Sequence, residues 1–160
     1  ITQHQRKRTE LNLRVARRGY DRAVERVTLG SHGDRPRPMM AGLEAVGLGL
    51  VEAGLRTYIA YPMTPSSGLL HFLAKQAPRF GLKVYQPEGE IAVMLMALGH
   101  AFAGERVAVG TSGGGFALMV EGLSLAGQAE LPIVVVLAQR TGPSTGLPTY
   151  TAQSDLDFAF

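Results

Sequence analysis

Between residues 40 and 140, short apolar segments alternate with longer apolar segments, and this alternation limits the chain to few folds. The short segments RTYIAYP, LKVYQPE, RVAVGTS and PIVVVLAQR are rich in β-branched and aromatic residues, which favours strands. The longer ones, residues 40–55, 66–80, 90–104 and 115–130, have the length and composition of helices. The sequence therefore predicts an α/β fold with a doubly wound, mostly parallel sheet and right-handed crossovers.

Composition narrows the class of protein further. The chain has 160 residues, of which 46% are hydrophobic, enough for one folded domain with a core. No uninterrupted apolar run reaches the length of a membrane span, and the polar N-terminus has no signal-peptide pattern, so we expect a cytoplasmic protein without a membrane partner. There is no cysteine, so these residues cannot hold an iron–sulfur cluster through thiolates.

The first 38 residues form a basic leader. Residues 1–40 carry ten Lys and Arg against four Asp and Glu, whereas residues 41–160 carry six against nine. Clustered arginine can bind nucleic acid, but the loosely helical apolar face of residues 5–27 favours a helix that lies on another domain. GSHGDRPRP then indicates a linker, which predicts two parts, 1–38 and 39–160. The chain begins with Ile1 and stops at Phe160, so we expect a fragment whose second part is truncated at its C-terminus.

Each predicted strand ends in a polar or glycine-rich turn. In parallel α/β sheets, ligands bind beyond the carboxyl ends of the strands. The turns YPMTPSS, QPEGE, GTSGGG and AQRTGPSTGLPT would therefore line one edge, which predicts a site among Thr64, Ser66, Ser67, Glu88, Glu90, Thr111, Ser112, Arg140, Ser144, Thr145 and Thr149.

Several of these residues also have structural interpretations. Ser66 and Ser67 suit a helix N-cap as well as a ligand contact, whereas Thr64 lies too early to be a cap. TSGGGF favours a tight strand-to-helix turn over a phosphate loop, because it lacks the lysine and spacing of that motif. Arg140 suits either an anionic ligand or a structural ion pair with Asp155 or Glu130.

Histidines do not add a metal site to this picture. His71 and His100 fall within apolar predicted helices and are interpreted as surface or hydrogen-bonded imidazoles. No pair of His, Asp or Glu has the spacing of metal ligands, so we expect no metal on this chain.

Four of these motifs, in order, resemble one known family. From about residue 40 to residue 160 the chain resembles the alpha subunit of 2-oxoacid:ferredoxin oxidoreductases, in its pyrimidine-binding domain for thiamine diphosphate. The matches are YPMTPSS (family form YPITPSS), QPEGEIAV (QMEDEIAA), TSGGGFALMVEG (TSGPGFSLMQEG) and QRTGPSTGLPT (QRGGPSTGLPT). The leader resembles, more weakly, the tail of the gamma domain that precedes this domain in fused subunits. Departures from the family pattern are Leu43, Pro87, Gly89 and Gly114.

The resemblance implies half of an active site. It implies that this chain binds the aminopyrimidine of thiamine diphosphate, while a beta subunit holds the diphosphate, Mg²⁺ and a 4Fe-4S cluster. Glu90 would be the catalytic glutamate that meets pyrimidine N1′, and Pro62 and Thr64 would also contact the cofactor. The residues expected to face the 2-oxoacid are Tyr61, Thr64, Arg140 and Thr149.

The activity implied is oxidative decarboxylation of a 2-oxoacid to an acyl-coenzyme A, with electrons passed to ferredoxin. Analogy with fused gamma–alpha subunits favours 2-oxoglutarate as the substrate. Two alternatives stay open: a partner-docking subunit that keeps the fold without catalysis, and another thiamine diphosphate enzyme of the decarboxylase or transketolase type.

Overall fold

The structure is a computed structural model that describes residues 3–24, 38–139 and 159. The chain divides into two compact units, Ile1–Pro38 and Met39–Phe160. The first unit contains helix α1 (Gln3–Arg22), as the basic leader predicts. Its apolar side chains Leu11, Leu13, Val15 and Tyr20 are all at least half exposed. Whether this unit is the end of a gamma domain stays a prediction.

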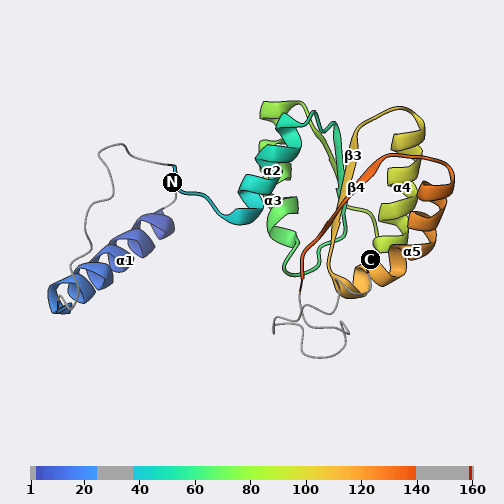
Figure 1. Ribbon diagram of the computed structural model, residues 1–160. Helices are drawn as coiled ribbons and strands as arrows, with labels where there is room; N and C mark the ends of the chain where they lie inside the picture. Colours follow the sequence, from blue (N-terminus) through green and yellow to red (C-terminus); the bar gives the residue numbers. More distant parts are fainter. Residues whose placement is uncertain (1–2, 25–37, 140–158, 160) are drawn as a thin grey trace. The chain divides into compact units, whose positions relative to one another are not determined.

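The second unit contains a parallel four-stranded sheet between helices (Figure 1). The strands lie in the order β2–β1–β3–β4, and all three pairings are parallel. Helices α2 and α3 cover one face, and α4 and α5 cover the other (Figure 1). The predicted doubly wound architecture is confirmed, with the elements α2 (Gly42–Glu52), β1 (Thr57–Ala60), α3 (Ser67–Phe80), β2 (Lys83–Tyr85), α4 (Glu90–Phe102), β3 (Val107–Thr111), α5 (Gly113–Gln128) and β4 (Ile133–Leu137).

Alternation along β1 and β3 divides the core in two. Side chains of successive strand residues point to opposite faces of a sheet. On β1, Tyr58 and Ala60 join the cluster with α2 and α3, whereas Ile59 joins the cluster with α4 and α5. All four residues of β1 are buried, so the strand has cover on both faces, as its continuous apolar sequence predicts.

Glycines end three of the helices at the amino edge of the sheet. Gly54 has φ +86° after α2, and Gly81 and Gly104 have φ +65° and +80° after α3 and α4. A residue with a side chain is strained in this left-handed region, so glycine stops each helix at low cost. The short turns that follow lead directly into β1, β2 and β3.

Two elements are less buried than their composition suggests. Gly47 is the only buried residue of helix α2, although the helix is rich in small and apolar residues, because the helix packs chiefly on α3. Strand β4 has the continuously apolar sequence that is typical of strands covered on both faces, but it forms an edge of the described sheet and Val134 is 51% exposed. None of the helices in the described ranges combines the length and hydropathy needed to cross a bilayer.

Candidate functional site

The strand order creates a switch point between β1 and β3. From β1 the chain passes through α3 to β2 on one side, then returns through α4 to β3 on the other. Helix α4 makes this return and packs on both β1 and β3. Because the helix of a parallel crossover runs back against its strands, the N-terminus of α4 lies at the carboxyl edge, where such sheets bind ligands.

Glu90 is the first residue of α4 and is buried. Its side chain is 5% exposed, and its Oε1 atom has no hydrogen-bond partner among the described residues. Gly89, the residue before the helix, is extended and makes no side-chain cap. Glu88, two positions earlier, is exposed. A buried carboxyl oxygen without a partner is costly, so Glu90 and Glu88 are in chemically different environments.

The turn after β3 lies against Glu90. A single residue, Ser112, separates β3 from α5, which confirms the tight strand-to-helix turn predicted from TSGGGF. Thr111 and Ser112 are fully buried, and the Ser112 hydroxyl has no partner among the described residues. Gly115, in the first turn of α5, approaches both Thr111 and the Glu90 side chain. The structure therefore brings together polar groups that follow β2 and β3.

The turn after β1 supplies the other described candidates. Tyr61 is 37% exposed, Pro62 is half-buried and Thr64 is exposed. The Thr64–Pro65 peptide bond is cis. These residues follow the central strand β1 at the same edge of the sheet as Glu90.

The capping interpretation of this turn needs a correction. Ser66 occupies the N-cap position of α3, but its side chain makes no cap hydrogen bond. Instead its hydroxyl donates to the carbonyl of Met63 at 2.7 Å, because the Ser66 backbone is already helical. The remaining predicted residues, Arg140, Ser144, Thr145 and Thr149, lie outside the described residues.

At the opposite, amino edge of the sheet there is a polar cluster that the sequence did not predict. The Glu105 carboxylate lies 2.6 Å from Lys83 Nζ and 2.9 Å from His100 Nδ1, and accepts a hydrogen bond of 2.8 Å from Thr57 Oγ1. The Lys83, Thr57 and His100 contacts together lower the pKa of Glu105 to about 2. His100 is thus hydrogen-bonded and His71 is exposed, as predicted, and within the described ranges no three His, Cys, Asp or Glu residues could hold a metal ion.

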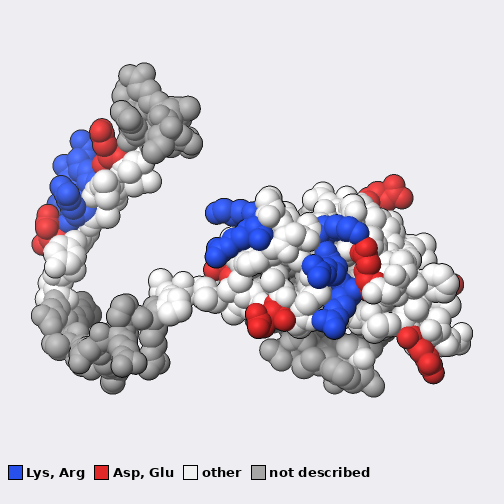
Figure 2. Space-filling view, turned by 90° about the horizontal axis from the view of Figure 1, so that it is seen from above, with Lys and Arg blue, Asp and Glu red and all other residues white. Residues whose placement is uncertain are grey.

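This cluster borders a basic hollow of about 650 Å³. Lys and Arg side chains gather beside an acidic patch on this face of the larger unit (Figure 2). Arg56, Lys83, Arg106 and Glu105 line the hollow together with the three helix-ending glycines. Arg106 donates to the carbonyl of Ala53 at the end of α2. Cations placed where helices end counter the negative ends of the helix dipoles, so this basic surface has a structural cause.

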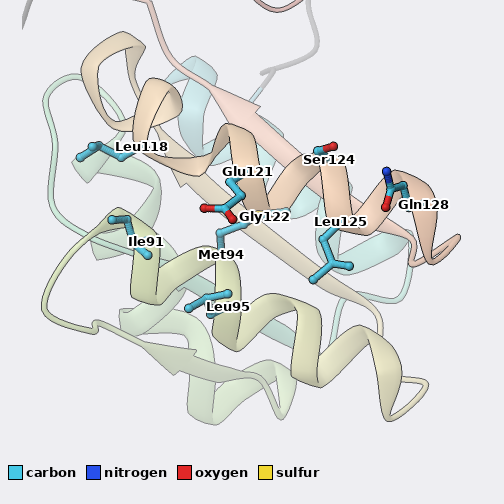
Figure 3. A pocket seen from close by; sticks show the side chains of 9 residues that line it. All are labelled: Ile91, Met94, Leu95, Leu118, Glu121, Gly122, Ser124, Leu125 and Gln128. Atoms are coloured by element: carbon cyan, nitrogen blue, oxygen red, sulfur yellow. The ribbon is translucent and has the colours of Figure 1, made fainter.

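A second hollow, of about 520 Å³, lies between α4 and α5 (Figure 3). It is mostly apolar, and among the described residues that line it Glu121 is the one with a charged side chain. None of the predicted site residues that the structure describes lines it; the described lining residues are Ile91, Met94, Leu95, Leu118, Glu121, Gly122, Ser124, Leu125 and Gln128. The candidate site is therefore the carboxyl edge around Glu90 rather than this hollow.

The fold and this site define a class of protein: a parallel α/β domain with a buried carboxyl at its switch point. Comparison with known proteins identifies the class more closely. Residues 48–160 match the family described as pyruvate flavodoxin/ferredoxin oxidoreductase, thiamine diphosphate-binding. The chain belongs to this family.

Individual relatives agree with the family match. The chain is 42% identical over 162 residues to the alpha subunit of 2-oxoacid:ferredoxin oxidoreductase 1 from Sulfurisphaera tokodaii, covering 93% of this chain and 26% of the relative. It is 41% identical over 117 residues to the 2-oxoglutarate synthase subunit KorA from Archaeoglobus fulgidus, covering 73% and 34%. The chain thus spans only about a quarter to a third of these relatives.

A solved structure supports the fold. This is the 2-oxoglutarate:ferredoxin oxidoreductase from Magnetococcus marinus with 2-oxoglutarate, coenzyme A and succinyl-coenzyme A bound. It superimposes with a TM-score of 0.66 at 46% sequence identity, over 69% of this chain and 19% of that one. The predicted thiamine-type α/β fold is confirmed by this likeness together with the family match.

Proposed function

We propose that this chain supplies the pyrimidine-binding half of a thiamine diphosphate site in the alpha subunit of a 2-oxoacid:ferredoxin oxidoreductase. The observation that carries the proposal is the Glu90 carboxyl, which is buried at the switch point with Oε1 unpartnered among the described residues. A cofactor nitrogen would satisfy this oxygen, so the residues present fit the pyrimidine of thiamine diphosphate.

Glu90 would act as an acid–base group. Its carboxyl, through Oε1, would hold a proton toward pyrimidine N1′ and could give up or take back this proton there. Such proton transfer by a positioned side chain typically accelerates a reaction by about 10² to 10⁴. When bound, thiamine diphosphate supplies the carbanion centre that attacks a keto carbon and accepts the electrons left when CO₂ departs. Burial would keep water away from the Glu90 carboxyl during these proton movements.

Two turns would bind and orient the 2-oxoacid. Pro62 and Thr64, after β1, would contact the cofactor, and Tyr61 and Thr64 would face the substrate from the same turn. Arg140 and Thr149, outside the described residues, would complete this set. A guanidinium presents a fork of donors that matches a carboxylate, so Arg140 would bind the carboxylate common to all 2-oxoacids.

The reaction proposed is oxidative decarboxylation of a 2-oxoacid to an acyl-coenzyme A with ferredoxin as electron acceptor. We favour 2-oxoglutarate, because relatives with 39 to 42% identity are named 2-oxoglutarate synthase or oxidoreductase subunits. Mg²⁺, the diphosphate contacts and a 4Fe-4S cluster would be held by a beta subunit; for the cluster, the absence of cysteine from these 160 residues agrees with this division. We also propose that this assembly is cytoplasmic.

Reconstitution tests the proposal. The full-length subunit would be purified with its partner subunit and assayed for coenzyme A-dependent reduction of viologen or ferredoxin with a panel of 2-oxoacids. Reduction that is fastest with 2-oxoglutarate is expected. Decarboxylation without electron transfer, from a complex lacking iron–sulfur absorbance, would favour another type of thiamine enzyme. Absence of any 2-oxoacid turnover with the cofactor bound would contradict a catalytic role.

A further inference from the structure

Gly115, the third glycine of TSGGGF, lies next to the Glu90 side chain. A Cβ atom placed on Gly115 would lie 2.7 Å from Glu90 Cγ and 2.8 Å from Glu90 Oε1, and nearer still to Thr111 Oγ1. Real Cβ atoms essentially never approach another heavy atom within 3.0 Å. Gly115 does not have a positive φ. Glycine is therefore required here for close approach to Glu90, not for an unusual backbone conformation.

The crowded groups have little freedom to move away. Thr111 is fully buried and its backbone pairs with Leu137 of the neighbouring strand. Helix α5 is held by buried Phe116 and Met119. The clash with Glu90 involves Cγ as well as the terminal oxygen, so turning the carboxylate alone does not relieve it. The Glu90 side chain would have to rotate about its Cα–Cβ bond, which moves the whole carboxyl group.

From this geometry we propose that Gly115 is a positioning residue, whose missing side chain leaves Glu90 in the rotamer that presents Oε1 at the switch point. The inference rests on the proposed function, because the position of Oε1 matters only if a ligand meets it there. Active-site groups must be held to within about 0.5 Å, and a 1 Å error costs about 10²-fold in rate.

The chain offers matched controls on the same helix. A Cβ atom on Gly122 would lie 2.5 Å from Met94 Cγ, so it crowds α4 against α5 without touching Glu90. A Cβ atom on Gly127 would meet nothing within 4 Å. Gly122→Ala therefore reproduces the packing strain of Gly115→Ala, and Gly127→Ala reports the effect of replacing a helical glycine alone.

The test uses the full-length subunit in complex with its partner and thiamine diphosphate. Three quantities are measured: the rate of hydrogen–deuterium exchange at thiazolium C2 of the bound cofactor, the cofactor dissociation constant by calorimetry, and the melting temperature. We expect Gly115→Ala to slow the exchange about 10- to 100-fold, with saturating cofactor. Gly122→Ala is expected to lower the melting temperature comparably but to keep the exchange within about twofold of wild type.

Three further variants separate the possible outcomes. If Gly115→Ala does not fold, the double variant Thr111→Ala, Gly115→Ala takes its place. It removes the closest clash and leaves the crowding of Glu90. The exchange rate of the double variant is then compared with that of Thr111→Ala alone. The positioning role would be overturned if the double variant and Thr111→Ala had equal exchange rates. It would also be overturned if Gly115→Ala and Gly122→Ala had equal exchange rates. Glu90→Gln is measured in parallel: wild-type exchange there would refute the proposed function, whereas slow exchange there and normal exchange in Gly115→Ala would refute this inference alone.

Discussion

Lys83 and Glu105 join the first residue of β2 to the turn before β3 through an ion pair of 2.6 Å. The other carboxylate oxygen of Glu105 accepts a hydrogen bond from the Thr57 hydroxyl and lies beside His100. One carboxylate thus connects the amino ends of β1 and β2 to the end of α4, at the edge of the sheet opposite Glu90.

This connection predicts acid sensitivity. The Lys83, Thr57 and His100 contacts lower the pKa of Glu105 from 4.5 to about 2. A carboxyl with a lowered pKa stabilises the fold above its unfolded value, and this stability is lost as pH falls through the folded value. Urea unfolding of wild type and Glu105→Gln should therefore differ most near neutral pH and converge as pH falls from about 4.5 to about 2. A difference that does not change with pH would contradict the ionic origin.

The close packing of Tyr58 against Gly110 predicts a second effect on stability. Tyr58 is fully buried, its hydroxyl has no partner among the described residues, and burial raises its pKa. A Cβ atom on Gly110 of β3 would meet this hydroxyl, and would lie 2.9 Å from Tyr58 Cζ. Gly110→Ala should cost about 1 to 3 kcal/mol of unfolding free energy through overpacking.

A substitution of Tyr58 supplies the control. Tyr58→Phe removes an unpaired buried hydroxyl and should be neutral or stabilising, because such a group costs about 1 to 3 kcal/mol when unsatisfied. In the Tyr58→Phe background the cost of Gly110→Ala should be smaller. If the changes in urea midpoint caused by Tyr58→Phe and Gly110→Ala were additive, the Tyr58 hydroxyl and the added methyl group would not compete for the same space.

Much of this architecture could be predicted from sequence because its causes are local. Apolar runs, helix-ending Gly54 and the polar turns are short-range patterns, and they gave the strands, helices and edge of the sheet. The family motifs also singled out Glu90, and burial distinguishes it from Glu88.

What the sequence missed depends on contacts between distant residues. TSGGGF indicates a tight turn, but the need for Gly115 arises from Glu90, which precedes it by a strand and a helix. Likewise Thr57, Lys83, His100 and Glu105 show no common pattern, and only the parallel register brings them together. Arg140 and Thr149 stay sequence predictions.

Thr64 gives a prediction about substrate binding. Thr64 is exposed, and in the proposed site its hydroxyl would hydrogen-bond the 2-oxoacid. Thr64→Val keeps the shape but removes this group, so KM for the 2-oxoacid should rise about 2- to 10-fold, as expected for one hydrogen bond. Thr64→Ser retains the hydroxyl and should remain close to wild type. Equal KM values for Val and Ser in steady-state assays of the reconstituted complex would remove Thr64 from the substrate site.

The central claim is that Glu90, and not Glu88, activates the cofactor. The direct measurement is hydrogen–deuterium exchange at thiazolium C2 of thiamine diphosphate bound to the full-length subunit and its partner, followed by quenching and NMR. Glu90→Gln should slow the exchange by about 10² to 10⁴, the usual contribution of a general acid–base group, while exposed Glu88→Gln stays within about twofold of wild type. Wild-type exchange in Glu90→Gln, with the cofactor shown by calorimetry to be bound, would contradict the account.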